Sequence, residues 1–112
     1  MEKKSREVVT SKAFDFIDLP SIHKYGWATF GLNLADYFIE EIYASLEDLS
    51  TNYYLHPECH HLETKTKKYR NIILGSYLII YRITPHRIEV LRAFHGSRSP
   101  KNIKESRNIK VD

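Results

Sequence analysis

"YRNIILGSYLIIYRITPHRIEVLRAFH", residues 69–95, is the stretch of sequence that decides the fold. It contains three apolar runs, at residues 69–74, 77–84 and 87–95, that are rich in Ile, Val, Leu, Tyr and Phe. These residue types favour β-strands. The Gly75-Ser76 pair between the first two runs fits a two-residue turn of type II′. The pattern therefore predicts an antiparallel meander of three strands.

The residues before this meander predict one strand and two helices. Residues 6–10 are short and β-branched, which favours a first strand, and a helix is expected at about residues 18–27 with Pro20 in its first turn. Apolar residues recur at helical spacing from 34 to 49, whereas residues 50–66 carry turn signals and predict a loop. The fold class is therefore α+β, with an N-terminal strand and two helices packed on an antiparallel meander.

Length and composition predict a single domain over residues 1–112. A basic C-terminal tail begins at about residue 99, and its weak apolar pattern of Ile103, Ile109 and Val111 fits an edge strand or a docked tail. The single cysteine excludes an intramolecular disulfide, and neither a secretory signal nor a membrane span is found. We therefore expect a cytoplasmic protein that makes no membrane contact.

The charge of the chain is strongly segregated. Residues 1–63 contain 5 Lys and Arg against 11 Asp and Glu, whereas residues 64–112 contain 12 against 3. Such segregation predicts a cationic face on the second half that attracts anionic partners. The alternative is that these charges lie on solvent-exposed strand faces and on the tail and bind no partner.

Alternation along the strands indicates which cations are available for binding. In the last strand it places Ile88, Val90, Arg92 and Phe94 on one face and Glu89, Leu91, Ala93 and His95 on the other. Arg70, Arg82 and Arg92 are then expected to line up on neighbouring strands, with Arg98 just beyond the last one. The alternative is that each arginine pairs with an acid such as Glu89, or covers the exposed side of the sheet.

Two other kinds of site receive less support. The sequence "HPECHH" brings together His56, Cys59, His60 and His61, but no second ligand pair follows downstream, so we expect neither a metal nor a cofactor. Tyrosines interleaved with cations are able to stack nucleic-acid bases, yet strand tyrosines more commonly fill a small core.

The order of several short motifs resembles the ParE branch of the ParE/RelE toxin superfamily, the toxic halves of bacterial toxin–antitoxin pairs. The likeness covers roughly residues 8–103. The matching elements are Asp18, Leu19 and Ile22 with Tyr25-Gly26, then Phe30-Gly31 and Ala35 to Phe38, then Arg70, Gly75-Ser76-Tyr77, Tyr81-Arg82, Ile88, Val90-Leu91-Arg92, His95 and Arg98.

This resemblance implies a RelE/ParE-like fold and a cognate ParD-like antitoxin as partner. It also implies DNA gyrase as the target, and operator DNA bound only through the antitoxin complex. The residues that it marks for binding the target or the antitoxin are Arg70, Tyr81, Arg82, Arg92, His95 and Arg98. We expect Arg98→Ala to fold normally and to lose toxicity.

The alternative within the superfamily is a RelE-like endoribonuclease that cuts mRNA on the ribosome. Metal-free RNA cleavage needs groups that activate the 2′-OH, protonate the leaving oxygen and stabilise the phosphorane. RelE-like nucleases supply a tyrosine near the C-terminus and an arginine early in the middle strand. Here no Tyr follows Arg98, and Leu78 stands at the arginine position. We therefore expect a protein that binds rather than an enzyme.

Overall fold

The computed structural model of the chain describes residues 5–96 and 100–112. Arg98, one of the predicted binding residues, lies outside the described residues. The main elements are β1 (Glu7–Thr10), a π-helical turn (Phe14–Asp18), α1 (Leu19–Phe30), α2 (Leu32–Asn52), β2 (Tyr69–Leu74), β3 (Tyr77–Ile83), β4 (Arg87–His95) and α3 (Pro100–Glu105), with 3-10 turns at His60–Leu62 and Ser106–Asn108.

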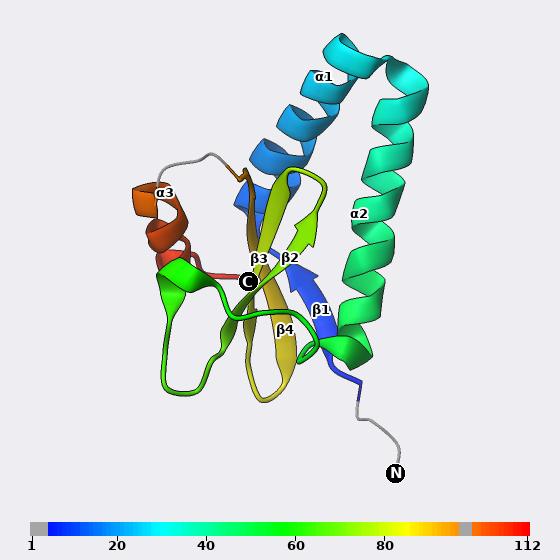
Figure 1. Ribbon diagram of the computed structural model, residues 1–112. Coiled ribbons are helices and arrows are strands. Elements are labelled where there is room, and N and C mark those ends of the chain that lie inside the picture. Colours follow the sequence, from blue (N-terminus) through cyan, green and yellow to red (C-terminus); the bar gives the residue numbers. More distant parts are fainter. Residues whose placement is uncertain (1–4, 97–99) are drawn as a thin grey trace.

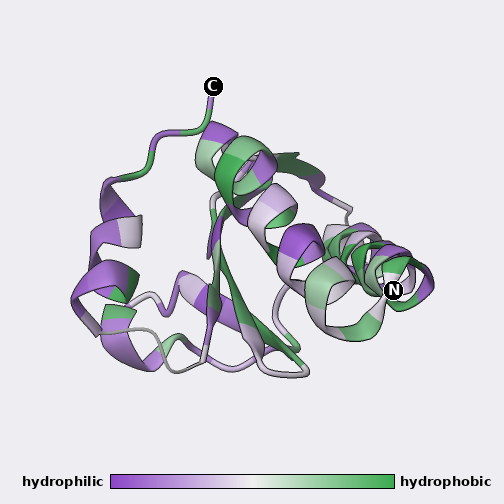
Figure 2. Ribbon diagram, turned by 90° about the horizontal axis from the view of Figure 1, so that it is seen from above, coloured by the Kyte–Doolittle hydropathy of each residue, from purple (hydrophilic) through white to green (hydrophobic). Residues whose placement is uncertain are grey.

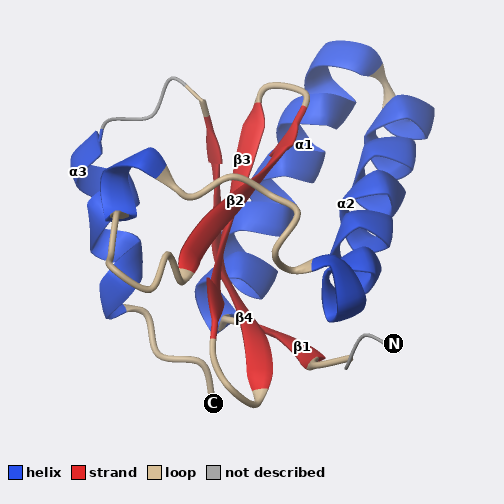
Figure 3. Ribbon diagram, turned by 60° about the horizontal axis from the view of Figure 1, so that its bottom comes forward, coloured by secondary structure: helices blue, strands red, loops and turns tan. Residues whose placement is uncertain are grey.

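The predicted meander is confirmed. β2, β3 and β4 pair antiparallel in chain order, and Gly75 in the first turn has the positive φ, 59°, that the type II′ expectation requires. β1 adds a parallel strand beside β4, which gives a mixed four-stranded sheet in the order β1-β4-β3-β2 (Figure 3). The α+β expectation is therefore correct, with one parallel pair added to it.

The sheet is covered on both faces. α1 and α2 form a hairpin on one face, while α3 and the C-terminal segment lie on the other (Figure 1). Seen from above, the strands run between these two layers (Figure 2). One core joins the hairpin to the sheet through residues such as Phe14, Ile42 and Tyr81. A second core packs the far face against Leu62 and Ile103.

The helical hairpin follows from the local sequence. Pro20 lies in the first turn of α1, where its missing N–H is tolerated. Gly31 ends α1 with φ 93° and ψ 164°, a conformation that only glycine adopts easily, so the chain reverses there within one residue. Within α1, Gly26 lets α2 approach closely, because a Cβ built on it would lie 3.3 Å from Ala35 Cβ.

The predicted alternation of β4 is wrong in its second half because of a β-bulge. The register with β3 shifts between Ile80 and Tyr81, so Tyr81 faces Val90 while Ile80 faces Arg92. Leu91 is the extra residue of the bulge, and the side chains that follow it change faces. Ala93 consequently packs with the helices, whereas Leu91 and Phe94 belong to the second core.

The C-terminal segment docks on the sheet, and no edge strand forms in its described part. Ile103 is 2% exposed in the second core, and Ile109 and Val111 pack against the same core. The docked-tail alternative is therefore correct, with the short helix α3 as an unexpected addition. No helix in the described ranges is long and apolar enough to cross a membrane.

Candidate functional site

Arg70 serves the fold of the loop that precedes β2. Its Nη1 donates to the carbonyl oxygens of Tyr54 and His56, both at 2.9 Å, and its Nε donates to Lys67 O at 3.1 Å. The guanidinium also lies over the Tyr54 ring, 5.3 Å from its centroid. Arg70 thus ties the end of α2 and the following loop to the sheet.

Arg82 lies in a network of charges on the far face of the sheet. Its Nε donates to Glu89 Oε1 at 2.7 Å, and Glu89 Oε2 accepts a 2.7 Å bond from Arg87 Nη2. The same guanidinium groups hold the C-terminal segment, because Arg82 donates to Ile109 O and Arg87 donates to Val111 O. We call Arg82, Arg87 and Glu89 the tail clamp.

Hydrogen bonds within the tail clamp shift the pKa values of Glu89 and Arg82 against the effect of burial. Desolvation alone would raise the pKa of Glu89, but the hydrogen bonds from Arg82 and Arg87 outweigh it and lower that pKa below its usual value. Desolvation likewise works to lower the pKa of Arg82, while hydrogen bonds with Tyr69 and Glu89 raise it overall. Both groups therefore remain charged inside the protein.

Arg92 pairs with Asp18 at the edge of the sheet. β1 pairs with β4 only as far as Val90, and beyond it Asp18 covers the strand edge. The Asp18 carboxylate accepts Nε and Nη2 of Arg92 at 2.8 Å each and the Ala93 N–H at 2.8 Å. The hydrogen bond to Asp18 raises the pKa of Arg92. Bidentate pairing of this kind fixes geometry as well as charge.

The expectation that these arginines form one row is therefore wrong. Arg70 stands opposite Tyr81 on the helix-facing side, whereas Arg82 and Arg92 lie on the far face, each with its own acid. The alternative, pairing with acids such as Glu89, is correct for Arg82, and Arg92 uses Asp18 in the same way. Whether these arginines also bind a partner stays a prediction.

The two other described candidates differ sharply in exposure. Tyr81 is fully buried, and its hydroxyl donates to Tyr53 O at 2.7 Å. Burial raises the pKa of Tyr81 above its ordinary value, so the phenol is an even weaker acid than an exposed tyrosine. His95 is exposed at the end of β4 and meets the Tyr77 ring edge-on, with 5.5 Å between the ring centroids.

The side chain of His95 borders an apolar groove. The groove has a volume of about 360 Å³ and lies between the α1–α2 hairpin and the β2–β3 turn. We call it the hairpin groove. It is lined by Ile22, Tyr25, Gly26, Phe30, Leu34, Ala35, Tyr37, Phe38, Ser76, Tyr77 and His95. Phe30, Leu34 and Tyr37 are 63%, 58% and 59% exposed, so large apolar side chains here face solvent.

One acidic side chain of α2 lies beside this groove: Glu41 forms a hydrogen bond with Tyr37, which raises the pKa of Tyr37. Asp36 and Glu40 line a separate hollow with Pro20 and His23, where Asp36 Oδ1 lies 2.7 Å from His23 Nε2. A surface that is apolar in the middle and acidic beside it is typical of a site for another protein.

Sequence reasoning missed the hairpin groove as a site. It assigned Leu34 to the buried face of the second helix, whereas Ala35, Ile42, Leu46 and Leu49 are the buried residues of α2. One signal in the sequence was available: the apolar side chains of this helix spread over more of its circumference than a single buried stripe needs. Leu32, Leu34 and Tyr37 fall outside that stripe and are exposed.

The histidine-rich segment does not converge on one point. Cys59 is buried in the second core, where desolvation raises the pKa of its thiol, and His56 meets the Tyr81 ring edge-on. The His60 side chain is 84% exposed. Within residues 5–96 and 100–112, no group of three or more His, Cys, Asp or Glu side chains is placed to hold a metal ion.

Comparison with known proteins identifies the family. A family model described as the ParE toxin of the type II toxin–antitoxin system, parDE, matches residues 17–100, which is most of the chain. The chain belongs to the ParE toxin family. Its matched residues include both helices of the hairpin groove and all three strands of the meander. The resemblance inferred from the sequence motifs is thereby confirmed.

A solved structure supports the same fold. A chain of the chromosomal ParDE toxin–antitoxin system from P. aeruginosa superposes with a TM-score of 0.66 at 14% sequence identity. The match covers 82% of this chain and 97% of that chain. No curated protein matches the sequence. A ParE-family toxin of the type II system has a cognate antitoxin as its partner.

Proposed function

We propose that this ParE-family toxin acts in the cytoplasm by binding DNA gyrase and stalling it, without breaking a bond of its own, and that a ParD-like antitoxin neutralises it. One observation carries this proposal. The described arginines predicted for the site hold the protein's own structure, whereas the hairpin groove exposes aromatic and aliphatic side chains to solvent. Large exposed apolar patches mark surfaces that bind other proteins.

The chemistry of the sheet argues against the ribonuclease alternative. A nuclease without metal needs a proton donor or acceptor and a free cation beside the scissile phosphate. Tyr81 is buried, and its hydroxyl donates to a backbone carbonyl. Arg82 is held by hydrogen bonds to Glu89 and to the C-terminal segment. Leu78 supplies no charge at the position where RelE-like nucleases place an arginine. These contacts support binding as the mode of action.

The hairpin groove also suits the antitoxin. We propose that a helix of the ParD-like partner lays apolar side chains into the groove and places Lys or Arg beside Glu41, as amphipathic helices do in apolar grooves. An antitoxin bound there covers the surface offered to gyrase. Operator DNA is then bound by the antitoxin, with the toxin carried in the complex.

Two assays on the purified toxin test the proposal. Inhibited supercoiling and cleaved DNA in the presence of gyrase are the expected results, together with intact mRNA on translating ribosomes. Cut transcripts with unaffected gyrase would replace the proposal by the ribonuclease alternative. Adding the antitoxin should restore supercoiling.

A further inference from the structure

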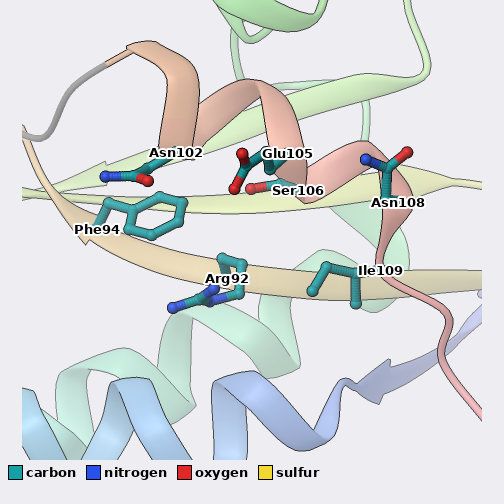
Figure 4. Close-up of a pocket in the computed structure, with 7 residues that line it drawn as sticks. All are labelled: Arg92, Phe94, Asn102, Glu105, Ser106, Asn108 and Ile109. Atoms are coloured by element: carbon teal, nitrogen blue, oxygen red, sulfur yellow. The ribbon is translucent and has the colours of Figure 1, made fainter.

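A second, polar cavity lies on the opposite side of the molecule from the hairpin groove. It measures about 460 Å³ and is bounded by β4, α3 and the 3-10 turn that follows α3. Figure 4 shows Asn102, Glu105 and Ser106 on one side of the gap, Arg92 and Ile109 on the other, and Phe94 and Asn108 toward its two ends. We call the cavity that these seven residues line the tail cavity.

The tail cavity gathers polar groups that have no described partner. Ser106 is 1% exposed, and its Oγ is the buried side-chain oxygen without a hydrogen-bond partner in the part of the chain that the structure describes. A buried hydroxyl without a partner is costly, so such groups usually have a ligand or an ordered water. Arg92 uses Nε and Nη2 on Asp18, which leaves Nη1 for a ligand.

The lining also sets the shape and charge of a ligand. The Arg92 guanidinium stacks over the Phe94 ring, 4.7 Å from its centroid, and this contact fixes the plane in which Nη1 donates. Glu105 accepts hydrogen bonds only, and Arg92 Nη1 donates only. Guanine fits this pair, because its N1–H and N2–H₂ donate on one edge and its O6 accepts beside them.

A neighbouring hollow on the surface favours an anion. It shares Glu105 and Asn108 with the tail cavity and is also lined by Lys101, Lys104 and Arg107, three exposed cations that we call the rim. A base inside the cavity would place its phosphate near these cations. We propose that the tail cavity binds a guanine nucleotide, with Glu105 and Arg92 reading the base, the amides of Asn102 and Asn108 and the Ser106 hydroxyl completing its hydrogen bonds, and the rim holding the phosphate.

The test titrates the full-length protein with guanosine 5′-monophosphate and, separately, with adenosine 5′-monophosphate, followed by amide chemical shifts in NMR. Adenine lacks the N1–H and N2–H₂ donors, so guanosine monophosphate should bind at least about fivefold more tightly, as expected for one paired base contact. The expected shifts lie at Arg92, Phe94 and Ser106. Equal shifts with both nucleotides, or shifts confined to Lys101, Lys104 and Arg107, would overturn the proposal.

Two substitutions separate binding from structure. Glu105→Gln should abolish the preference for guanine, whereas Glu47→Gln, an exposed control on α2, should leave it unchanged. Ser106→Ala removes a buried hydroxyl that lacks a partner, so it should raise the melting temperature and yet weaken nucleotide binding. A Ser106→Ala protein that binds normally would contradict the assignment of this hydroxyl to the ligand.

A third comparison distinguishes the source of the nucleotide. A single-stranded trinucleotide of RNA with guanosine in the middle is titrated beside the monophosphate and beside a trinucleotide of uridine. Tighter binding of the guanosine-containing strand assigns the cavity to single-stranded nucleic acid, and tighter binding of the monophosphate assigns it to the free nucleotide. Weak and equal binding of all three overturns the site.

Discussion

The sheet and the helical hairpin of this toxin use their conspicuous side chains in opposite ways. On the sheet, Arg82 and Arg92 look like a cationic binding surface in the sequence, but carboxylates inside the protein neutralise them. On the hairpin, Leu34 follows the helical spacing of the core residues, but both it and the nearby Phe30 face solvent. The comparison teaches that charge on a strand is weak evidence for a binding site until its partners are known.

The largest effect on stability is expected at Asp18. Asp18→Asn removes the charge that pairs with Arg92 and leaves a mostly buried guanidinium uncompensated, which should lower the free energy of unfolding by about 3 kcal/mol. Urea unfolding measures this loss. Asp48→Asn, on the exposed surface of α2, is the control and should cost less than about 1 kcal/mol. Similar losses at both positions would show that the Asp18–Arg92 pair does not support the fold.

A somewhat smaller effect is expected at Glu89 in the tail clamp. Glu89→Gln weakens charge-assisted bonds to Arg82 and Arg87 and should cost about 2 kcal/mol at neutral pH. The folded pKa of Glu89 is lowered, so its contribution is present above the ordinary Glu pKa of about 4 and is lost as pH falls through the lowered value. Unfolding measured from pH 7 to pH 3 should show the two proteins converging. A constant difference across this range would argue against the ion pair.

Gly31 tests the corner between the two helices. Gly31→Ala forces a Cβ into a backbone with φ 93° and should destabilise the protein by about 1–3 kcal/mol. Gly26→Ala is the matched control, because its gain in helix propensity opposes a tight contact with Ala35, and the change should stay within about 1 kcal/mol. Thermal unfolding of both variants measures the difference. A loss at Gly31 as small as the one at Gly26 would mean that the corner tolerates residues other than glycine.

The smallest effect on stability is expected in the hairpin groove. The double substitution Phe30→Ser with Leu34→Ser changes only exposed side chains, so the free energy of unfolding should move by no more than about 0.5 kcal/mol per residue. Growth inhibition at matched expression should nevertheless be clearly weaker. A variant that is unstable would assign these residues to the core, which is where the helical spacing placed Leu34.

Much of the fold was predictable because its signals are local. The three strands, the Gly75 turn and both long helices follow from side-chain periodicity and turn chemistry. The bulge at Leu91 was not predictable in this way, since it depends on where Asp18 and Ser11 meet the edge of β4. The prediction of the binding site was wrong for a related reason. Arg92 pairs with Asp18, which is 74 residues away in the sequence. Strand alternation says which face a side chain is on, but it does not identify a partner so far along the chain.

Inhibition of gyrase supercoiling, measured for the wild-type toxin and for the Phe30→Ser, Leu34→Ser variant, tests directly whether the hairpin groove binds the target. The wild-type protein should inhibit, and roughly ten times more of the variant, equally folded by circular dichroism, should be needed for the same inhibition, because central apolar contacts dominate binding. Equal inhibition by the two proteins, or none by the wild type, would contradict this role of the groove.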